Sequence, residues 1–432
     1  MFISQILNSL VYSGGEKSAI YFYTHYTTQI GGIILILLSS RYLIYLPVYE
    51  RFNRGFWMLR PMIFIILYAS VVGLILGIVP RDFVYLCLLP FASSLLILLP
   101  AHHEIKKRLI KIFSLQIVIA ICLGIYGIAT SQPESISIAW RDIWYQSPEA
   151  MATNSLFAVP LLIAGFGKIR RWQVAAALSG YLLYMYMSFR GLNRGSIVSY
   201  GLILPFALLA VKLKGRGLTW KILLLLKAVA ILVLVLLTIS LLNIHILSFL
   251  GLDDAVNQML YRFTSSQEWL GLSEMLNRTF QMFLWETQEI RGAEIKDFLS
   301  FIEPWVYVVG RGFGTTWYSR YWEMDWNIVH SGPFYLIFRG GIPLLITYLL
   351  LVLSAWKHSW LNATNDWVAQ GCFAYLTCRI FSFIFYGAYV SEYSYYAFWL
   401  IVGMAMSSIP GSRREESPEY LIHPSGKLGL NI

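Results

Sequence analysis

Long apolar runs alternate along this chain with short polar gaps. Each run holds roughly 20 mostly apolar residues, and a helix of that length crosses the hydrocarbon core of a bilayer, which is about 30 Å thick. The pattern therefore predicts about eleven transmembrane helices. They lie near residues 29–49, 59–79, 82–101, 109–129, 150–167, 173–189, 196–211, 222–242, 333–355, 367–388 and 394–409.

One polar gap is much longer than the others. It covers residues 243–332, between the eighth and ninth predicted spans, and holds too many aromatic residues for a disordered linker. We expect two or three amphipathic helices in it. In order, these are a helix beginning near Asp253, helices over Ser273–Glu289 and Ala293–Phe301, then a glycine-punctuated turn at Gly310–Gly314, an aromatic stretch at Trp317–Trp326, and the start of the ninth span at His330–Pro333.

The composition agrees with a membrane protein. Apolar residues make up 57% of the chain and charged residues 13%, whereas soluble domains carry about 25% charged residues. We predict an all-α polytopic membrane protein with one large helical extracytoplasmic loop. Its parts are an N-terminal transmembrane bundle (1–242), the loop (243–332), C-terminal transmembrane helices (333–410) and a cytoplasmic tail (411–432).

The net charge of +10 does not indicate nucleic-acid binding, because the basic residues form short clusters between apolar runs. They are concentrated in alternate gaps, as the positive-inside rule requires of cytoplasmic loops. With eleven spans, this pattern predicts an outside N-terminus and a cytoplasmic C-terminus. The basic gaps hold Arg51, Arg54, Arg60, Lys106, Lys107, Arg108, Lys111, Lys168, Arg170, Arg171, Lys212, Lys214, Arg216, Lys221, Lys357, Arg413, Arg414 and Lys427, and the opposite short gaps hold Arg81, Arg141, Arg190 and Arg194.

Two arginines on the outer side interrupt this trend. Arg190 and Arg194 lie in the short gap before the seventh span, which opens with Gly195 and Ser196. Arginine binds phosphate oxygens in a bidentate manner, and the free N–H groups of a helix start can bind the same anion. These residues are therefore candidates for a phosphate site, and binding of a lipid headgroup is the simpler alternative.

Further candidate residues lie in the late loop and the helix that follows it. His330 stands at the mouth of the ninth span, with Arg278 and Arg311 earlier in the loop. Arg339 and Arg379 lie deeper in apolar runs, where a guanidinium must meet carbonyl groups, water or an anionic ligand. The sequence has no metalloprotease, nucleophile-elbow, Walker-type or paired-cysteine motif, and we predict no metal and no cofactor.

Taken in order, these motifs resemble the bacterial O-antigen polymerase and O-antigen ligase superfamily. The resemblance covers about residues 185–350, and its late signature is a glycine-rich turn, a His-Asn pair and a helix with a Gly-Ile step. This chain has Ser331 where the pair has Asn. The residues that carry the likeness are Asn193-Arg194-Gly195-Ser196, Arg278 in Leu-Asn-Arg-Thr-Phe, Val309-Gly-Arg-Gly-Phe-Gly314, His330 followed by Pro333-Phe-Tyr-Leu-Ile337, and Gly340-Gly-Ile-Pro-Leu344.

The resemblance implies a metal-independent inverting glycosyltransferase with a GT-C-like fold in the bacterial inner membrane. Its donor is a glycan on undecaprenyl diphosphate, used at the periplasmic face. By resemblance, Arg194 and Arg278 hold the diphosphate and His330 lies near the acceptor hydroxyl. Arg190, Arg311 and Arg339 complete the candidate diphosphate-binding residues. Expected partners are the glycan donor and acceptor, membrane lipids, and assembly proteins such as a flippase and a chain-length regulator, but no nucleic acid.

Three hypotheses for the function of the chain stay open. A polymerase, which we favour, transfers the growing glycan to another lipid-linked repeat unit, whereas a ligase transfers it to lipid A–core. A lipid-linked oligosaccharide flippase or other transporter is the alternative from another class, with Arg379 as its main support.

Overall fold

The computed structural model describes residues 59–76, 94, 96–97, 103–130, 158–190, 197–214, 217, 292–320, 323–326, 329, 331–385 and 395–407. This part of the chain is mostly helical. Its helices are α4 (Leu59–Ile75), α6 (His103–Thr130), α9 (Val159–Ala164), α10 (Arg171–Arg190), the π-helix η5 (Ile197–Ile203), α12 (Leu204–Leu213), α17 (Gly292–Phe301), α18 (Pro304–Val309), α19 (Gly332–Asn362), α20 (Trp367–Phe385) and α21 (Tyr395–Ser407). The strands are β1 (Trp317–Ser319) and β2 (Met324–Trp326).

The helices agree with the hydrophobic pattern in eight of the expected positions. The other three runs, near 29–49, 82–101 and 222–242, lie wholly or almost wholly outside the described residues. Among the described helices, α19 alone is long and apolar enough to cross a membrane; shorter apolar stretches occur at Arg60–Ile75, Ser199–Leu213 and Ala397–Ser407.

The late loop (residues 243–332) follows its expected order where the structure describes it, with one unexpected helix, α18, between α17 and the glycine turn. Helix α17 matches the predicted helix over Ala293–Phe301, and α19 begins at Gly332 as expected. The aromatic stretch departs from the all-α prediction, because it forms a small antiparallel hairpin in which Trp317 pairs with Trp326. Aromatic residues suit strands, and Ser319 Oγ donates to Asp297 Oδ2 of α17 at 2.9 Å, which fastens the hairpin to that helix.

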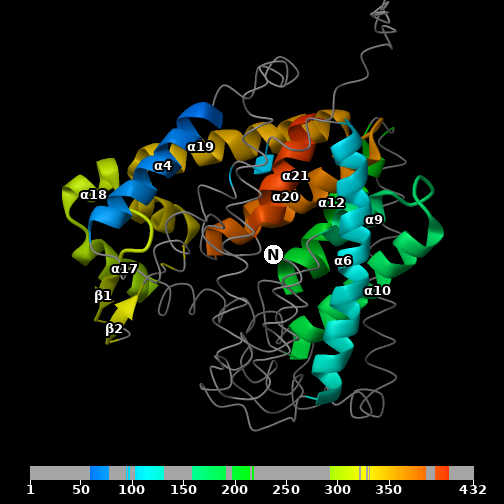
Figure 1. Ribbon diagram of the computed structural model, residues 1–432, viewed down its shortest axis with the longest axis horizontal. Helices are drawn as coiled ribbons and strands as arrows, with labels where there is room; N and C mark the ends of the chain where they lie inside the picture. The colour runs from blue at the N-terminus through cyan, green and yellow to red at the C-terminus, as the bar shows by residue number, and fades with distance from the viewer. Residues whose placement is uncertain are drawn as a thin grey trace, which may run out of the picture.

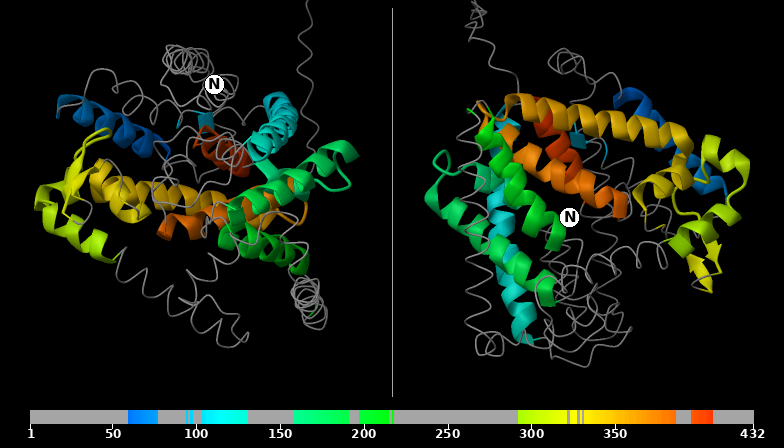
Figure 2. Two further views of the ribbon diagram at one scale, coloured as in Figure 1. Left: turned by 90° about the horizontal axis from the view of Figure 1, so that it is seen from below. Right: turned by 180° about the vertical axis from the view of Figure 1, so that it is seen from behind.

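Helix α19 connects two groups of elements (Figures 1 and 2). Helices α17 and α18 and the hairpin gather around its beginning, while α6, α9, α10 and α12 lie toward its far end, and α6 runs crosswise to it. Phe298 of α17 is fully buried against Trp317 of β1 and Phe338 of α19, with ring centroids 5.2 and 5.6 Å away. These edge-to-face contacts join the loop elements to the start of α19.

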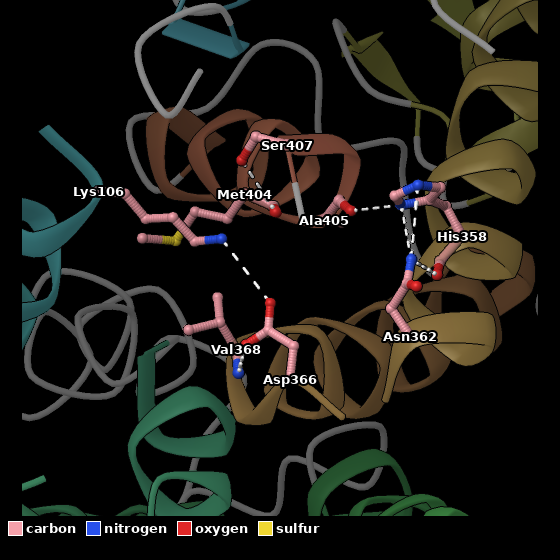
Figure 3. A network of polar contacts seen from close by, with 8 residues as sticks. All are labelled: Lys106, His358, Asn362, Asp366, Val368, Met404, Ala405 and Ser407. Atoms are coloured by element: carbon pink, nitrogen blue, oxygen red, sulfur yellow. Dashed lines mark hydrogen bonds and ion pairs between the residues drawn. The ribbon is translucent and has the colours of Figure 1, made fainter. Parts of the chain in front are cut away.

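Polar contacts join the far end of α19, and the short connection from it to α20, to several other helices. Lys106 of α6 lies 3.9 Å from Asp366, whose Oδ1 accepts from the Val368 N–H at the start of α20. Nδ1 of His358 in α19 lies 2.9 Å from the Ala405 carbonyl oxygen of α21 (Figure 3). Lys214, at the end of α12, donates to the carbonyls of Trp360 and Leu361. Cations are well placed at a helix C-terminus, where carbonyl groups lack helical partners.

Candidate functional site

A break inside α19 creates the binding partner for the glycine-rich turn. Gly340 and Gly341 have non-helical backbone angles, and Pro343 has no N–H to donate to the carbonyl of Arg339. The backbone N–H of Arg311 donates to the Phe338 carbonyl at 2.7 Å, and that of Gly312 donates to the Arg339 carbonyl at 3.0 Å. The turn therefore satisfies two carbonyl groups that the helix break would otherwise leave open.

Two of the motifs that carry the family resemblance thus meet in space. The turn, Gly310–Gly314, and the Gly340–Leu344 segment are far apart in sequence, yet a Cβ on Gly310 would lie 2.5 Å from the Gly340 nitrogen. A Cβ on Gly341 would lie 2.4 Å from the Val308 carbonyl oxygen. Backbones approach so closely here that a larger residue would separate them.

The other side of the turn packs against α4. Gly312 has a φ of +88°, and a Cβ there would lie 2.2 Å from the Gly73 nitrogen. The Phe313 N–H donates to the Ala69 carbonyl at 3.0 Å, and the Phe313 side chain is fully buried. The turn is therefore fixed between α4 and α19.

Arg339 completes the connection from the α19 side. Its side chain is 2% exposed, and Nη1 donates to the carbonyls of Gly312 and Thr315 at 3.0 and 2.8 Å. Its Cζ lies 5.0 Å from the ring centroids of Tyr335 and Phe338. The guanidinium thus meets carbonyl groups and aromatic faces. This supports a role for Arg339 in positioning the glycine turn, whereas the sequence predicted a direct contact with the diphosphate.

We expect Arg339→Leu to lower the free energy of unfolding by about 2–4 kcal/mol, because two carbonyl groups lose their buried donor. Arg320, an exposed arginine directly after β1, is the matched control, and Arg320→Leu should change stability by less than about 0.5 kcal/mol. The apparent melting temperatures of the purified variants check this. Equal melting of both variants would contradict the positioning role.

Arg311 lies at the edge of the same turn in a different environment. Its Cζ is 4.9 Å from the ring centroid of Phe301 and 5.8 Å from that of Trp305. Nη2 is 3.7 Å from Glu303 Oε2, and the two side chains are 25% and 54% exposed. Trp305 Nε1 donates to the same Glu303 oxygen. The structure therefore brings a cation, a carboxylate and two aromatic rings together at an accessible position.

A second polar group surrounds the start of the seventh predicted span. The π-helix η5 begins at Ile197, and such distortions of a helix are frequent at functional sites. The Tyr181 hydroxyl of α10 donates to the Tyr200 carbonyl at 3.0 Å, and Cys378 Sγ of α20 donates to the Ser199 carbonyl at 3.0 Å. Neighbouring helices therefore hold the π-helix on two sides.

Arg379 lies next to this group. Its Nε donates to the Tyr375 hydroxyl one turn earlier in α20, at 3.1 Å, and its Cζ is 5.3 Å from that ring centroid. The Tyr375 side chain thus supplies both a hydrogen-bond acceptor and an aromatic face to Arg379.

The remaining predicted site residues fall outside the described part of the chain. These are Arg194, Arg278 and His330, and for Arg190 the structure describes only the backbone at the end of α10. Within the described residues, no group of three or more His, Cys, Asp or Glu could hold a metal ion.

Two residues of the site, Thr315 and Glu303, were not expected from the sequence. Thr315 presents its carbonyl to Arg339, and Glu303 lies between Arg311 and Trp305. The one available signal for Glu303 was its position directly before Pro304, at a helix start.

Comparisons with known proteins assign no family to the chain: no protein-family model matches it, and no curated protein matches it.

Proposed function

We propose that this protein is a metal-independent inverting glycosyltransferase that polymerises undecaprenyl-diphosphate-linked repeat units into O-antigen or a related surface polysaccharide. The observation that carries the proposal is the contact between the glycine turn and the break in α19. These segments hold two of the sequence motifs by which the chain resembles the O-antigen polymerase and ligase superfamily, and the two motifs contact each other through backbone hydrogen bonds and close backbone packing.

The proposed reaction needs stabilisation of a departing diphosphate. We assign this to the arginines near the outer helix ends, Arg190, Arg194 and Arg278, since fixed guanidinium groups stabilise charge that develops on phosphate oxygens. His330 serves as the general base for the acceptor hydroxyl. Its neighbour Ser331 directly precedes α19, which is anchored to the glycine turn only two helical turns later. A rigid anchor at this point supports precise placement of the base.

We propose that the chain crosses the bacterial inner membrane eleven times, with its N-terminus outside and its C-terminus in the cytoplasm. Exposed apolar side chains support the membrane setting. On α19 they recur at helical spacing on one face, at Ile342, Ile346, Leu350 and Leu353, and α4 has a similar stripe at Phe64, Leu67, Val71 and Leu74. In water such continuous apolar stripes would be unfavourable, whereas lipid tails cover them without cost.

The proposed function is tested by a glycan profile of a deletion strain rescued with wild type or with His330→Ala. Surface lipopolysaccharide and lipid-linked glycan are both separated by size. We expect single capped repeats without a ladder in the deletion strain and in the His330→Ala strain, and a full ladder after rescue with wild type.

Other profiles identify the competing functions. Long chains on the polyprenyl carrier with a bare lipid A–core would indicate a ligase. Accumulation of single repeats on the cytoplasmic side of the membrane would indicate a flippase. A normal ladder in the deletion strain would remove the proposal.

A further inference from the structure

The accessible group beside the glycine turn has unused hydrogen-bonding capacity. Glu303 Oε2 contacts both Trp305 Nε1 and Arg311 Nη2, and within the described part of the chain Oε1 makes no hydrogen bond. The Arg311 guanidinium likewise donates no hydrogen bond to the described residues, and its ion pair with Glu303 spans 3.7 Å. A carboxylate acceptor and several guanidinium donors therefore remain available side by side.

The pair is set against an aromatic surface. Trp305 is 42% exposed on α18, which lies at the edge of the molecule (Figure 1). Arg311 packs on the rings of Phe301 and Trp305, so its position is fixed before any ligand arrives. Because Glu303 already balances the charge of Arg311, the group as a whole is close to neutral and suits a polar uncharged ligand better than a diphosphate.

We propose that Glu303, Trp305 and Arg311 form a glycan-binding subsite. The apolar C–H face of a pyranose packs on the exposed part of the Trp305 ring, and neighbouring hydroxyl groups donate to Glu303 Oε1 and accept from Arg311. The inference rests on the proposed function, because it assigns the group to the glycan of that reaction. It also gives Arg311 a sugar contact in place of the diphosphate contact expected from the sequence.

The position of the subsite agrees with this role. Arg311 belongs to the turn that is bonded to α19, so the subsite is rigidly connected to the helix whose start follows His330. A glycan held there would be kept at a fixed distance from the proposed base, and the subsite would select and orient the glycan while taking no part in the transfer.

The test measures binding without catalysis. The probe is the free oligosaccharide released by mild acid from the lipid-linked glycan of the source bacterium, titrated calorimetrically into the full-length protein in nanodiscs. We expect Trp305→Ala to weaken binding about tenfold or more. Glu303→Gln, which keeps an acceptor for Trp305 Nε1 and so preserves the fold, should weaken it about fivefold. Trp172→Ala is the matched control, because Trp172 is 49% exposed on α10, and it should bind within about twofold of wild type.

Two results would overturn the subsite. One is unchanged affinity in both Trp305→Ala and Glu303→Gln, which would leave the group as a surface ion pair only. The other is displacement of the oligosaccharide from wild type by inorganic pyrophosphate, which would return Arg311 to the diphosphate. The failure of the subsite can be distinguished from the failure of the proposed function. A normal ladder in the deletion strain would rule out the proposed glycosyltransferase, whatever the protein binds. A lost ladder, together with unchanged binding by both variants, would rule out only the subsite.

Discussion

Replacing Gly312 by alanine is expected to lower the free energy of unfolding by about 4 kcal/mol or more and to abolish the proposed polymer formation. Two effects add at this position. An L-residue at the positive φ of +88° costs roughly 1–2 kcal/mol by itself. The new Cβ would also lie 2.2 Å from the Gly73 nitrogen and 2.7 Å from the Ala69 carbonyl oxygen, so the turn must leave α4 and lose its bonds to α19.

Gly167→Ala provides the matched control. Gly167 also has a positive φ, +78°, but a Cβ there would meet nothing within 4 Å. This variant should therefore show only the backbone cost of roughly 1–2 kcal/mol. The two variants are compared by apparent melting temperature and by the glycan ladder in the deletion strain. If Gly312→Ala melts with Gly167→Ala and restores a full ladder, the turn is not fixed between α4 and α19 as described.

Replacing Arg194 or Arg278 by alanine is expected to slow the proposed glycan transfer about 100-fold or more, because in the proposed reaction each arginine faces charge that develops on the diphosphate. The rate is measured in proteoliposomes supplied with lipid-linked repeat units. The effect should fall on the transfer rate more than on substrate binding, since the charge is largest as the diphosphate departs.

Arg81 and Arg141 are the controls for this prediction. Both lie in short gaps on the same predicted side of the membrane, but we assign them no part in diphosphate binding. Alanine at either position should leave the rate within about twofold of wild type. Near-normal rates in all four variants would contradict the assignment of the diphosphate site.

The positions of the described helices in the apolar runs, and of α17, were predictable from the sequence, whereas α18 (Pro304–Val309) was not expected. Apolar runs of sufficient length leave a helix as the structure that satisfies its own backbone hydrogen bonds, whether in lipid or in a buried core. The start of α19 was predictable as well, since Ser331 and Pro333 suit a helix N-terminus. The hairpin was not predictable. The aromatic residues of this stretch indicated only an ordered loop, and they did not indicate that Trp317 pairs with Trp326.

In the candidate site, too, some features were predictable from the sequence and others were not. The sequence by itself determined that glycines punctuate the 310–314 turn, that Gly340 and Gly341 precede Pro343, and that arginines stand beside both segments. Only the tertiary structure decided which groups meet: the N–H groups of the turn donate to the carbonyls that the α19 break leaves open, and Arg339 donates back to the turn. It also paired Arg311 with Glu303 and left Arg339 buried. Local sequence sets where a backbone can bend, but hydrogen bonds between distant segments depend on which surfaces fold together, and that is settled by packing across the whole chain.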